Sequence, residues 1–260
     1  MKKVIELIRA ASRLMTDCDR AEITAKGRSN FVTDADVAVQ EYIRTGLLAL
    51  YPDYGFMSEE QENAPDFKKP LWILDPIDGT ANFITHYHQS AISLALFSEG
   101  EVVFGAIYNP FTDELFSAEK GKGAFCNGEP ISADHEVEFQ AAIIDLGTMP
   151  YYKDRAREVG RMTEEIILRA GDMRRIGSAA FAMAYAAAGR TGAMLEGILQ
   201  PWDFAAGKLI AVEAGAMVSD WAGAPLDVKN PSSVMVSGKK VYDELLRLIK
   251  EVRNELDQSK

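Results

Sequence analysis

The spacing of apolar and polar residues divides the chain into a helical beginning, a strand-rich middle and an alternating second half. Apolar residues recur at helical spacing over 4–15 and over 37–48, which predicts two amphipathic helices, the second with Asp34 as its cap. Short apolar runs between turn residues then predict the strands of an antiparallel or mixed sheet. These runs are GFMS, LWILD, SAISLALF, VVFGAIYN and ELFSA.

Beyond about residue 140, strand-like and helical segments alternate. The strand-like segments are AAIIDLG, MRRIG, AMLEG, AMVSD and VMVSG. The helical segments are AREVGRMTEEIILRAG, SAAFAMAYAAAG, a segment around Trp202, and VYDELLRLIKEVRNEL. The pattern predicts an α+β half over 1–140 and a layered α/β half over 141–260. Because no repeat, low-complexity tract or Pro-rich linker separates the halves, we expect one compact unit with an extensive internal interface.

Composition and charge narrow the class of protein. With 260 residues, 47% of them hydrophobic, the chain can bury a large core. The 28 Lys and Arg against 39 Asp and Glu give a net charge of -11, which argues against a nucleic-acid partner bound through a basic face. Two cysteines, Cys18 and Cys126, favour a reducing compartment over a disulfide framework. The first helix is amphipathic and no segment has the apolar length of a membrane span, so we expect a cytoplasmic protein without membrane contact.

The segment LWILDPIDGT places two aspartates where a buried strand is predicted to end. Pro76 is predicted to stop the pairing of that strand, so that the chain turns and brings Asp78 back beside Asp75. Two carboxylates that close repel each other, and one takes up a proton unless a cation lies between them. Carboxylates together with a backbone carbonyl, here that of Ile77, suit Mg²⁺. The alternative is an Asp-rich turn in which each carboxylate only accepts hydrogen bonds from the backbone.

The residues after this turn and three acidic residues elsewhere bear on the same chemistry. Gly79 lets the backbone approach an anion closely, and Thr80 adds a hydroxyl near the start of the next helix. Glu59 follows the predicted strand GFMS, Asp203 opens the helix of PWDFAAG, and Asp36 follows NFVT. Each of the three also has a local explanation: a solvated surface charge, a first-turn carboxylate and a helix cap, respectively.

Taken together, these segments resemble the inositol monophosphatase family, which belongs to a superfamily of magnesium-dependent, lithium-sensitive phosphatases. The resemblance spans nearly the whole chain. It is carried by KGRSNFVTDAD, FMSEE, WILDPIDGTANF, GKGAFCNGEPI, RRIGSAA and PWDFAAGKLIAVEAG. The resemblance implies an alternating α-β-α-β-α sandwich of the inositol monophosphatase and fructose bisphosphatase type, and it implies a homodimer.

The resemblance also assigns roles to the acidic residues. It implies that Glu59, Asp75 and the Ile77 carbonyl bind one Mg²⁺. Asp75, Asp78 and Asp203 are implied to bind a second Mg²⁺, with a third ion held loosely near Glu59. Two close cations can acidify water and neutralise the charge of a phosphate ester during in-line displacement.

The resemblance further assigns residues to catalysis and to the substrate. Thr80, linked to Asp36, is implied to orient and deprotonate the attacking water, while Lys26 matches a residue near the acidic cluster or is a solvated loop lysine. The residues implied to bind substrate are Asp78, Gly79, Thr80, Thr148, Gly177, Ser178, Ala179 and Glu196. Local alternatives are a turn at Thr148 and a helix start at 177–179.

The expected function is hydrolysis of inositol monophosphate, or of a similar small polyol or sugar phosphate, by metal-activated water. The alternatives are a fructose-1,6-bisphosphatase, a histidinol-phosphatase or a 3',5'-bisphosphate nucleotidase of the same superfamily, or a regulatory binding protein without catalysis. No G-x-G-x-x-G follows a predicted strand, which excludes a Rossmann-type nucleotide site. His86 and His88 depart from the family pattern, and because no further Cys or His lies nearby, surface imidazoles are favoured over a zinc site.

Overall fold

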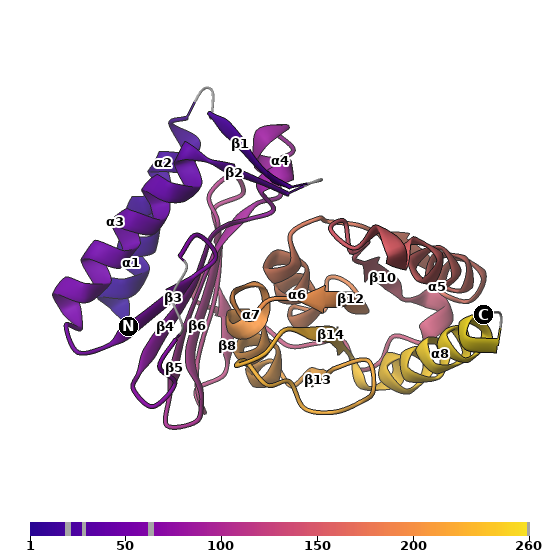
Figure 1. Ribbon diagram of the computed structural model, residues 1–260. Helices are drawn as coiled ribbons and strands as arrows, with labels where there is room; N and C mark the ends of the chain where they lie inside the picture. The colour runs from indigo at the N-terminus through magenta and orange to yellow at the C-terminus, as the bar shows by residue number, and fades with distance from the viewer. Residues whose placement is uncertain (19–21, 28–29, 62–64, 259–260) are drawn as a thin grey trace.

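Five layers of alternating helices and sheets make up the protein (Figure 1). The computed structural model describes residues 1–18, 22–27, 30–61 and 65–258. One helical layer covers the outer face of a seven-stranded sheet, a second lies between the two sheets, and a third lies against the five-stranded sheet (Figure 1). The predicted alternating, mixed fold is therefore confirmed. The helices of the three layers are, in this order, α1 (Lys2–Ala11), α2 (Arg13–Thr16) and α3 (Asp34–Leu50), then α6 (Ala179–Ala187) and α7 (Pro201–Glu213), then α5 (Ala156–Arg169) and α8 (Lys239–Gln258).

The seven-stranded sheet contains all five strands predicted in the middle of the chain. Its order is β3-β4-β5-β6-β7-β8-β9, with β3 parallel to β4 and every other neighbouring pair antiparallel. Strand β4 is buried over its whole length because α3 and α7 both contact it, which explains its continuous apolar run. The strands are β3 (Gly55–Ser58), β4 (Leu71–Asp78), β5 (Ala91–Ser98), β6 (Glu101–Asn109), β7 (Glu114–Glu119), β8 (Ala124–Cys126) and β9 (Glu129–Pro130).

The five-stranded sheet has the order β11-β10-β12-β14-β13. Its first three strands are parallel, so their carboxyl ends lie at one edge of the sheet, while β14 runs antiparallel to both of its neighbours. The predicted alternation of strands and helices is confirmed here. The strands are β10 (Ile143–Leu146), β11 (Asp172–Arg174), β12 (Ala193–Leu199), β13 (Met217–Ser219) and β14 (Ser232–Ser237).

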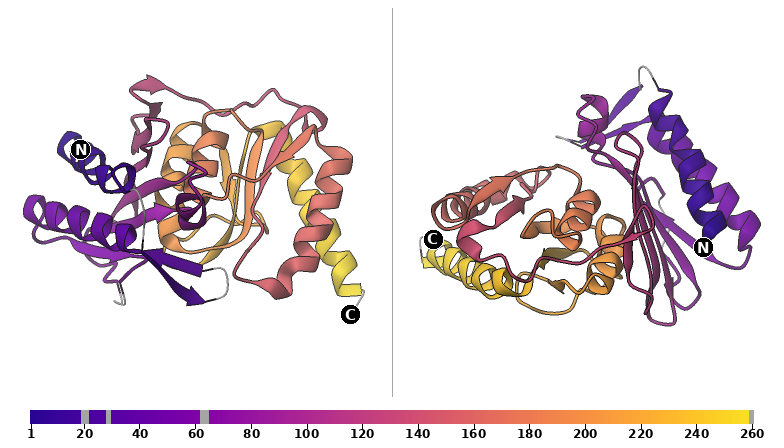
Figure 2. Two further views of the ribbon diagram at one scale, coloured as in Figure 1. Left: turned by 90° about the horizontal axis from the view of Figure 1, so that it is seen from above. Right: turned by 180° about the vertical axis from the view of Figure 1, so that it is seen from behind.

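Helices α6 and α7 lie between the two sheets, as Figure 2 shows from two further directions. Small residues allow this close fit. A Cβ atom at Gly105 of β6 would lie 2.8 Å from the carbonyl oxygen of Ala206 in α7. At Gly207 a Cβ would lie 2.8 Å from the sulfur of Met183 in α6. The close approach buries α6 almost completely and most of α7, so neither shows the amphipathic pattern of the outer helices.

The beginning of the chain differs from the sequence prediction at two points. The first predicted helix is interrupted at Ser12, between α1 and α2. Asp34 is not the cap of α3, because it is the first helical residue, whereas Thr33 has the extended backbone of an N-cap and its side chain accepts a hydrogen bond from the Asp36 amide. Five short elements complete the described fold: the antiparallel strands β1 (Ile23–Gly27) and β2 (Asn30–Thr33), the helix α4 (Thr80–Ile84), and the 3₁₀ helices Phe139–Ala141 and Lys153–Arg155.

Candidate active site

The turn at the end of β4 brings two aspartates together without ending the strand. The prediction that Pro76 stops the pairing is wrong, because pairing with β5 lapses after Asp75 and resumes at Asp78, which lies opposite Ala91. The interruption is a β-bulge, which changes the direction in which the side chains of this segment point. The Ile77 amide donates a 3.0 Å hydrogen bond to Asp75 Oδ1. Gly79, at a φ of 87°, then turns the chain into α4 (Thr80–Ile84).

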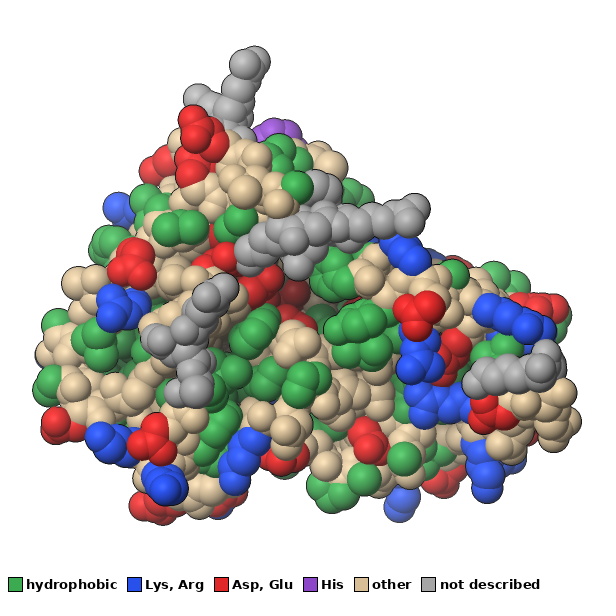
Figure 3. Space-filling model, in the orientation of Figure 1, with side chains coloured by type: hydrophobic (Ala, Val, Ile, Leu, Met, Phe, Trp, Pro, Cys, Tyr) green, Lys and Arg blue, Asp and Glu red, His purple; other side chains and the backbone are tan. Residues whose placement is uncertain are grey.

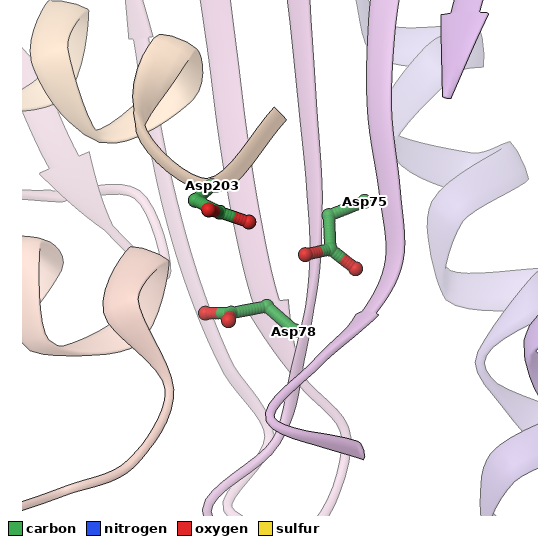
Figure 4. Close-up of side chains that lie close together, drawn as sticks. All are labelled: Asp75, Asp78 and Asp203. Carbon is green, nitrogen blue, oxygen red and sulfur yellow. The ribbon is translucent and has the colours of Figure 1, made fainter. Parts of the chain in front are cut away.

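A third aspartate comes from the second half of the chain. Asp203 lies in the first turn of α7, where its Oδ2 accepts a 2.7 Å hydrogen bond from the Gln200 amide. Figure 4 shows Asp75, Asp78 and Asp203 facing a common space. One oxygen from each of the three carboxylates lies within 4.8 Å of the others, and in the described part of the chain this is the one such group of His, Cys, Asp or Glu side chains.

The electrostatics of the three aspartates fit a cation. Burial raises the pKa of Asp75 well above its usual range, and the nearby charges of Glu59, Asp78 and Asp203 raise it further. Burial also raises the pKa of Asp203, and the charge of Asp78 adds to that effect. Closely spaced carboxylate oxygens repel one another unless a positive charge compensates them. Such oxygens are the ligands that hard divalent cations prefer. The three aspartates could therefore hold a metal ion.

Asp78 is buried and connects the two halves of the chain. Its Oδ2 accepts hydrogen bonds from Ser178 Oγ at 2.6 Å and from the Ala180 amide at 2.7 Å, both at the start of α6. Burial raises the pKa of Asp78, and these two hydrogen bonds oppose that rise. Asp78 also supplies one of the three carboxylate oxygens that lie within 4.8 Å of one another.

A cleft of about 750 Å³ contains the acidic cluster. Figure 3 shows acidic side chains gathered in the hollow between the two halves. Glu59, which follows β3, and Ile77 line this cleft, and the charge of Glu59 acts on both Asp75 and Asp203. The predicted metal ligands thus line one cavity. Burial raises the pKa of all three aspartates, and nearby negative charges raise those of Asp75 and Asp203 further.

The predicted catalytic pair, Asp36 and Thr80, is in contact. Thr80 Oγ1 lies 3.3 Å from Asp36 Oδ1 and 3.2 Å from the carbonyl oxygen of Ile77, so its single proton can go to either acceptor. Asp36 is 1% exposed and its Oδ2 also accepts from the Thr33 amide at 2.8 Å. Asp36 is therefore both part of the α3 capping box and a neighbour of Thr80. Lys26 is in β1, but its side chain is outside the part that the structure describes.

On the substrate side, most of the predicted residues line the cleft. Glu196 of β12 does so, and its Oε1 accepts a 3.2 Å hydrogen bond from the Met149 amide. Gly147 leaves room for this side chain, since a Cβ there would lie 2.1 Å from Glu196 Cδ. The loop 177–179 also lines the cleft. Thr148 is exposed and does not line it, and its hydroxyl accepts a 2.8 Å hydrogen bond from Arg175 Nε.

Several cleft residues were not predicted from the sequence. Asn82 donates 2.8 Å hydrogen bonds to the carbonyls of Gln89 and Ile176, which ties α4 to the loop before α6. Asp145, at the end of β10, and Arg175 also line the cleft. Asp145 carried a usable signal, because it follows the apolar run AAII in the way that Asp75 follows LWIL.

The two histidines after α4 do not form a metal site with other described residues. His86 and His88 have φ values of 52° and 61°, and the His88 ring stacks on Phe111 with 4.7 Å between ring centroids. The His88 ring therefore contributes to the packing of this loop.

The fold and the cleft define a layered α-β-α-β-α protein with a carboxylate site suited to metal. The chain belongs to the inositol monophosphatase family, whose profile matches residues 1–255. The inositol-1-monophosphatase of Mesorhizobium japonicum is 34% identical over 245 residues, 93% of this chain and 91% of that protein. Nus factor SuhB of Xylella fastidiosa is 34% identical over 251 residues, 94% of this chain and 88% of that protein.

The fold comparison agrees with the family. A solved IMPase of Thermotoga maritima superimposes with a TM-score of 0.89 at 32% identity, covering 96% of each chain. The resemblance stated from the sequence, and with it the sandwich type, is confirmed. Within the described residues, no helix is long and apolar enough to cross a membrane.

Proposed function

We propose that this protein is a magnesium-dependent phosphomonoesterase that hydrolyses inositol monophosphate or a similar small polyol phosphate. The observation that carries the proposal is the convergence of Asp75, Asp78 and Asp203 in one cleft. The aspartates come from two halves of the chain, so a local turn motif does not account for their meeting. Membership of the inositol monophosphatase family supports the reaction class.

The acidic residues would hold two to three Mg²⁺ ions. Glu59, Asp75 and the Ile77 carbonyl are proposed for one ion, and Asp75, Asp78 and Asp203 for a second. Bound there, the ions would neutralise the charge of the phosphate oxygens and make a water molecule more acidic. The carboxylates themselves need no proton in that state, because their mutual repulsion is compensated.

Thr80 and Asp36 are proposed to handle the proton of the attacking water. Thr80 Oγ1, 3.3 Å from Asp36 Oδ1, can donate to that carboxylate and accept from a water on its other side. Asp36 is oriented by the amide of Thr33, so the acceptor is held in place before substrate arrives.

The remaining predicted residues would bind the ester. Gly79, in the left-handed conformation at the start of α4, is proposed to offer its backbone amide to the phosphate. Glu196 is proposed to accept hydrogen bonds from hydroxyls of the leaving group, and the loop 177–179 to line its other side. Thr148 would act only at the rim, through Arg175. By the family resemblance, Lys26 is a further candidate.

A regulatory binding role is the second candidate, because several of the relatives are named Nus factor SuhB. The two roles make different demands on the cleft: a binding surface does not need the paired aspartates, whereas hydrolysis does. The net charge of -11 disfavours direct contact with nucleic acid in either case. We also propose a homodimer and inhibition by lithium, which light scattering and a lithium titration would test.

The test of the proposed function is phosphate release from a panel of esters with Mg²⁺ and with chelator. We expect release to require Mg²⁺ and to fall by more than about 100-fold in Asp75→Asn. Asp243→Asn is the matched control, because Asp243 is an exposed aspartate on α8. Mg²⁺-independent release, or an active Asp75→Asn variant, would reject the assignment.

A further inference from the structure

The inner end of the cleft is built from the carboxyl ends of three parallel strands. Asp145 of β10 pairs in register with Arg174 of β11 on one side and with Met194 of β12 on the other. Asp145, Arg175 and Glu196 all line the cleft at this edge. Ligands of sheets with parallel strands bind at such an edge, because the side chains that end the strands face one crevice there.

Asp145 is a buried carboxylate with an unused oxygen. The residue is 2% exposed, and its Oδ2 accepts a 2.8 Å hydrogen bond from the Ile176 amide. Its Oδ1 accepts no hydrogen bond from any residue that the structure describes. Burial raises the pKa of Asp145 to about 6, against the lowering effects of the Ile176 hydrogen bond and of the Arg175 charge. Because Asp145 lines the cleft, a bound ligand that supplies a hydrogen-bond donor can use this oxygen as its acceptor.

The charges at this end of the cleft disfavour a second phosphate. Asp145 and Glu196 contribute two carboxylates, and Arg175 is the one Lys or Arg among the described residues that line the cleft. Arg175 is held at the rim by its 2.8 Å hydrogen bond to Thr148 Oγ1. Two carboxylates against one guanidinium repel an additional anion, whereas hydroxyl groups can donate to both carboxylates.

We propose that Asp145 is a further specificity-determining residue, which together with Glu196 accepts hydrogen bonds from two hydroxyls of the leaving group. The substrate is then the monophosphate of a neutral polyol, and bisphosphates are poor substrates. This inference rests on the proposed function and narrows its substrate class. Asp145 plays no part in the cleavage itself, because it belongs to the second sheet rather than to the acidic cluster of the β4 turn.

The test uses two esters of similar shape, inositol 1-phosphate and cyclohexyl phosphate, which has no hydroxyls. In Asp145→Asn the amide oxygen can still accept from the Ile176 amide, while an NH₂ group replaces the free acceptor. We expect the ratio of kcat/KM for the two esters to fall by about 10- to 100-fold in this variant. A purely structural role of Asp145 would lower both values equally and leave the ratio unchanged, which would overturn the proposal.

Measurements on the wild-type protein keep the test independent of the variant's folding. Wild-type protein should prefer inositol 1-phosphate to cyclohexyl phosphate, and fructose 1-phosphate to fructose 1,6-bisphosphate. Equal kcat/KM within either pair would contradict the role of Asp145 while leaving the phosphatase assignment intact. If the protein releases phosphate from none of these esters with Mg²⁺, both proposals are rejected.

Discussion

Ser178 donates a 2.6 Å hydrogen bond to Asp78 across 100 positions of the chain. The donor lies at the start of α6 and the acceptor at the end of β4, so the bond joins the acidic turn, proposed to bind metal, to the loop proposed to contact the substrate. Both residues are buried, which makes the bond sensitive to the loss of either partner. The acidic site is thus supported by a contact between the two halves of the chain, in addition to the packing of α7 on the strands of the first sheet.

Ser178→Ala should weaken both stability and activity. Asp78 would keep the Ala180 amide as a donor but lose the hydroxyl, so its pKa would rise further. We expect the free energy of unfolding to fall by about 1–3 kcal/mol and the apparent Mg²⁺ affinity to decrease. Ser178→Thr keeps the hydroxyl and should lose less of both. Denaturant unfolding and Mg²⁺ titration would measure this, and equal values for Ser178→Ala and wild type would contradict it.

Asp75→Asn should separate stability from function. In chelator, the variant removes one of several buried charges that repel one another, so its melting temperature should exceed that of the wild-type protein. With Mg²⁺ the order should reverse, because the wild-type protein gains binding free energy that the variant lacks. Thermal scans of both proteins with and without Mg²⁺ would show the crossing. A variant less stable than wild type in chelator would argue against charge repulsion in the cluster.

Glu196 should make stability depend on pH in a defined window. Its pKa is raised from 4.5 to about 7 because burial disfavours the charged form. The folded state therefore holds the Glu196 proton more tightly than the unfolded state does, and this contribution to stability is lost as pH rises from about 4.5 to about 7. In chelator, we expect the free energy of unfolding of wild type to fall relative to that of Glu196→Gln as pH rises over that range. Above that range the difference between the two proteins should be constant. A difference that does not change with pH would contradict the raised pKa.

Gly79→Ala and Gly100→Ala form a matched pair. Both glycines have similar backbone angles, with φ of 87° and 91°. A Cβ at Gly79 would lie 3.1 Å from the carbonyl oxygen of Gln89 and 3.2 Å from that of Gly177, whereas a Cβ at Gly100 meets nothing within 4 Å. Gly100→Ala should cost only the left-handed backbone strain of about 1–2 kcal/mol. Gly79→Ala should cost more and also lower kcat, and equal losses of stability would show that the contacts at Gly79 are unimportant.

Much of the architecture follows from local pattern. The continuous apolar run LWIL is typical of a strand buried on both faces, and α5 and α8 have clear amphipathic spacing. The secondary structure of these segments could therefore be predicted without the structure. The segments WILDPIDGTANF and PWDFAAG, which follow each other along the chain in this order, likewise indicated a family and candidate metal ligands. Caps are harder, because Thr33 and Asp34 are both good capping residues and only the backbone angle at Thr33 decides between them.

The sequence by itself determined the element types, the acidic residues available and the charge that makes the cleft negative. Only the tertiary structure decided that Asp203 meets Asp75, that Asp36 reaches Thr80, and that Asp145 ends beside Glu196 while Thr148 stays at the rim. The physical reason is the distance along the sequence over which each kind of interaction acts. Periodicity and capping depend on neighbours within a turn or two, whereas these contacts depend on how both sheets pack against α6 and α7, through residues about 40 to 130 positions apart.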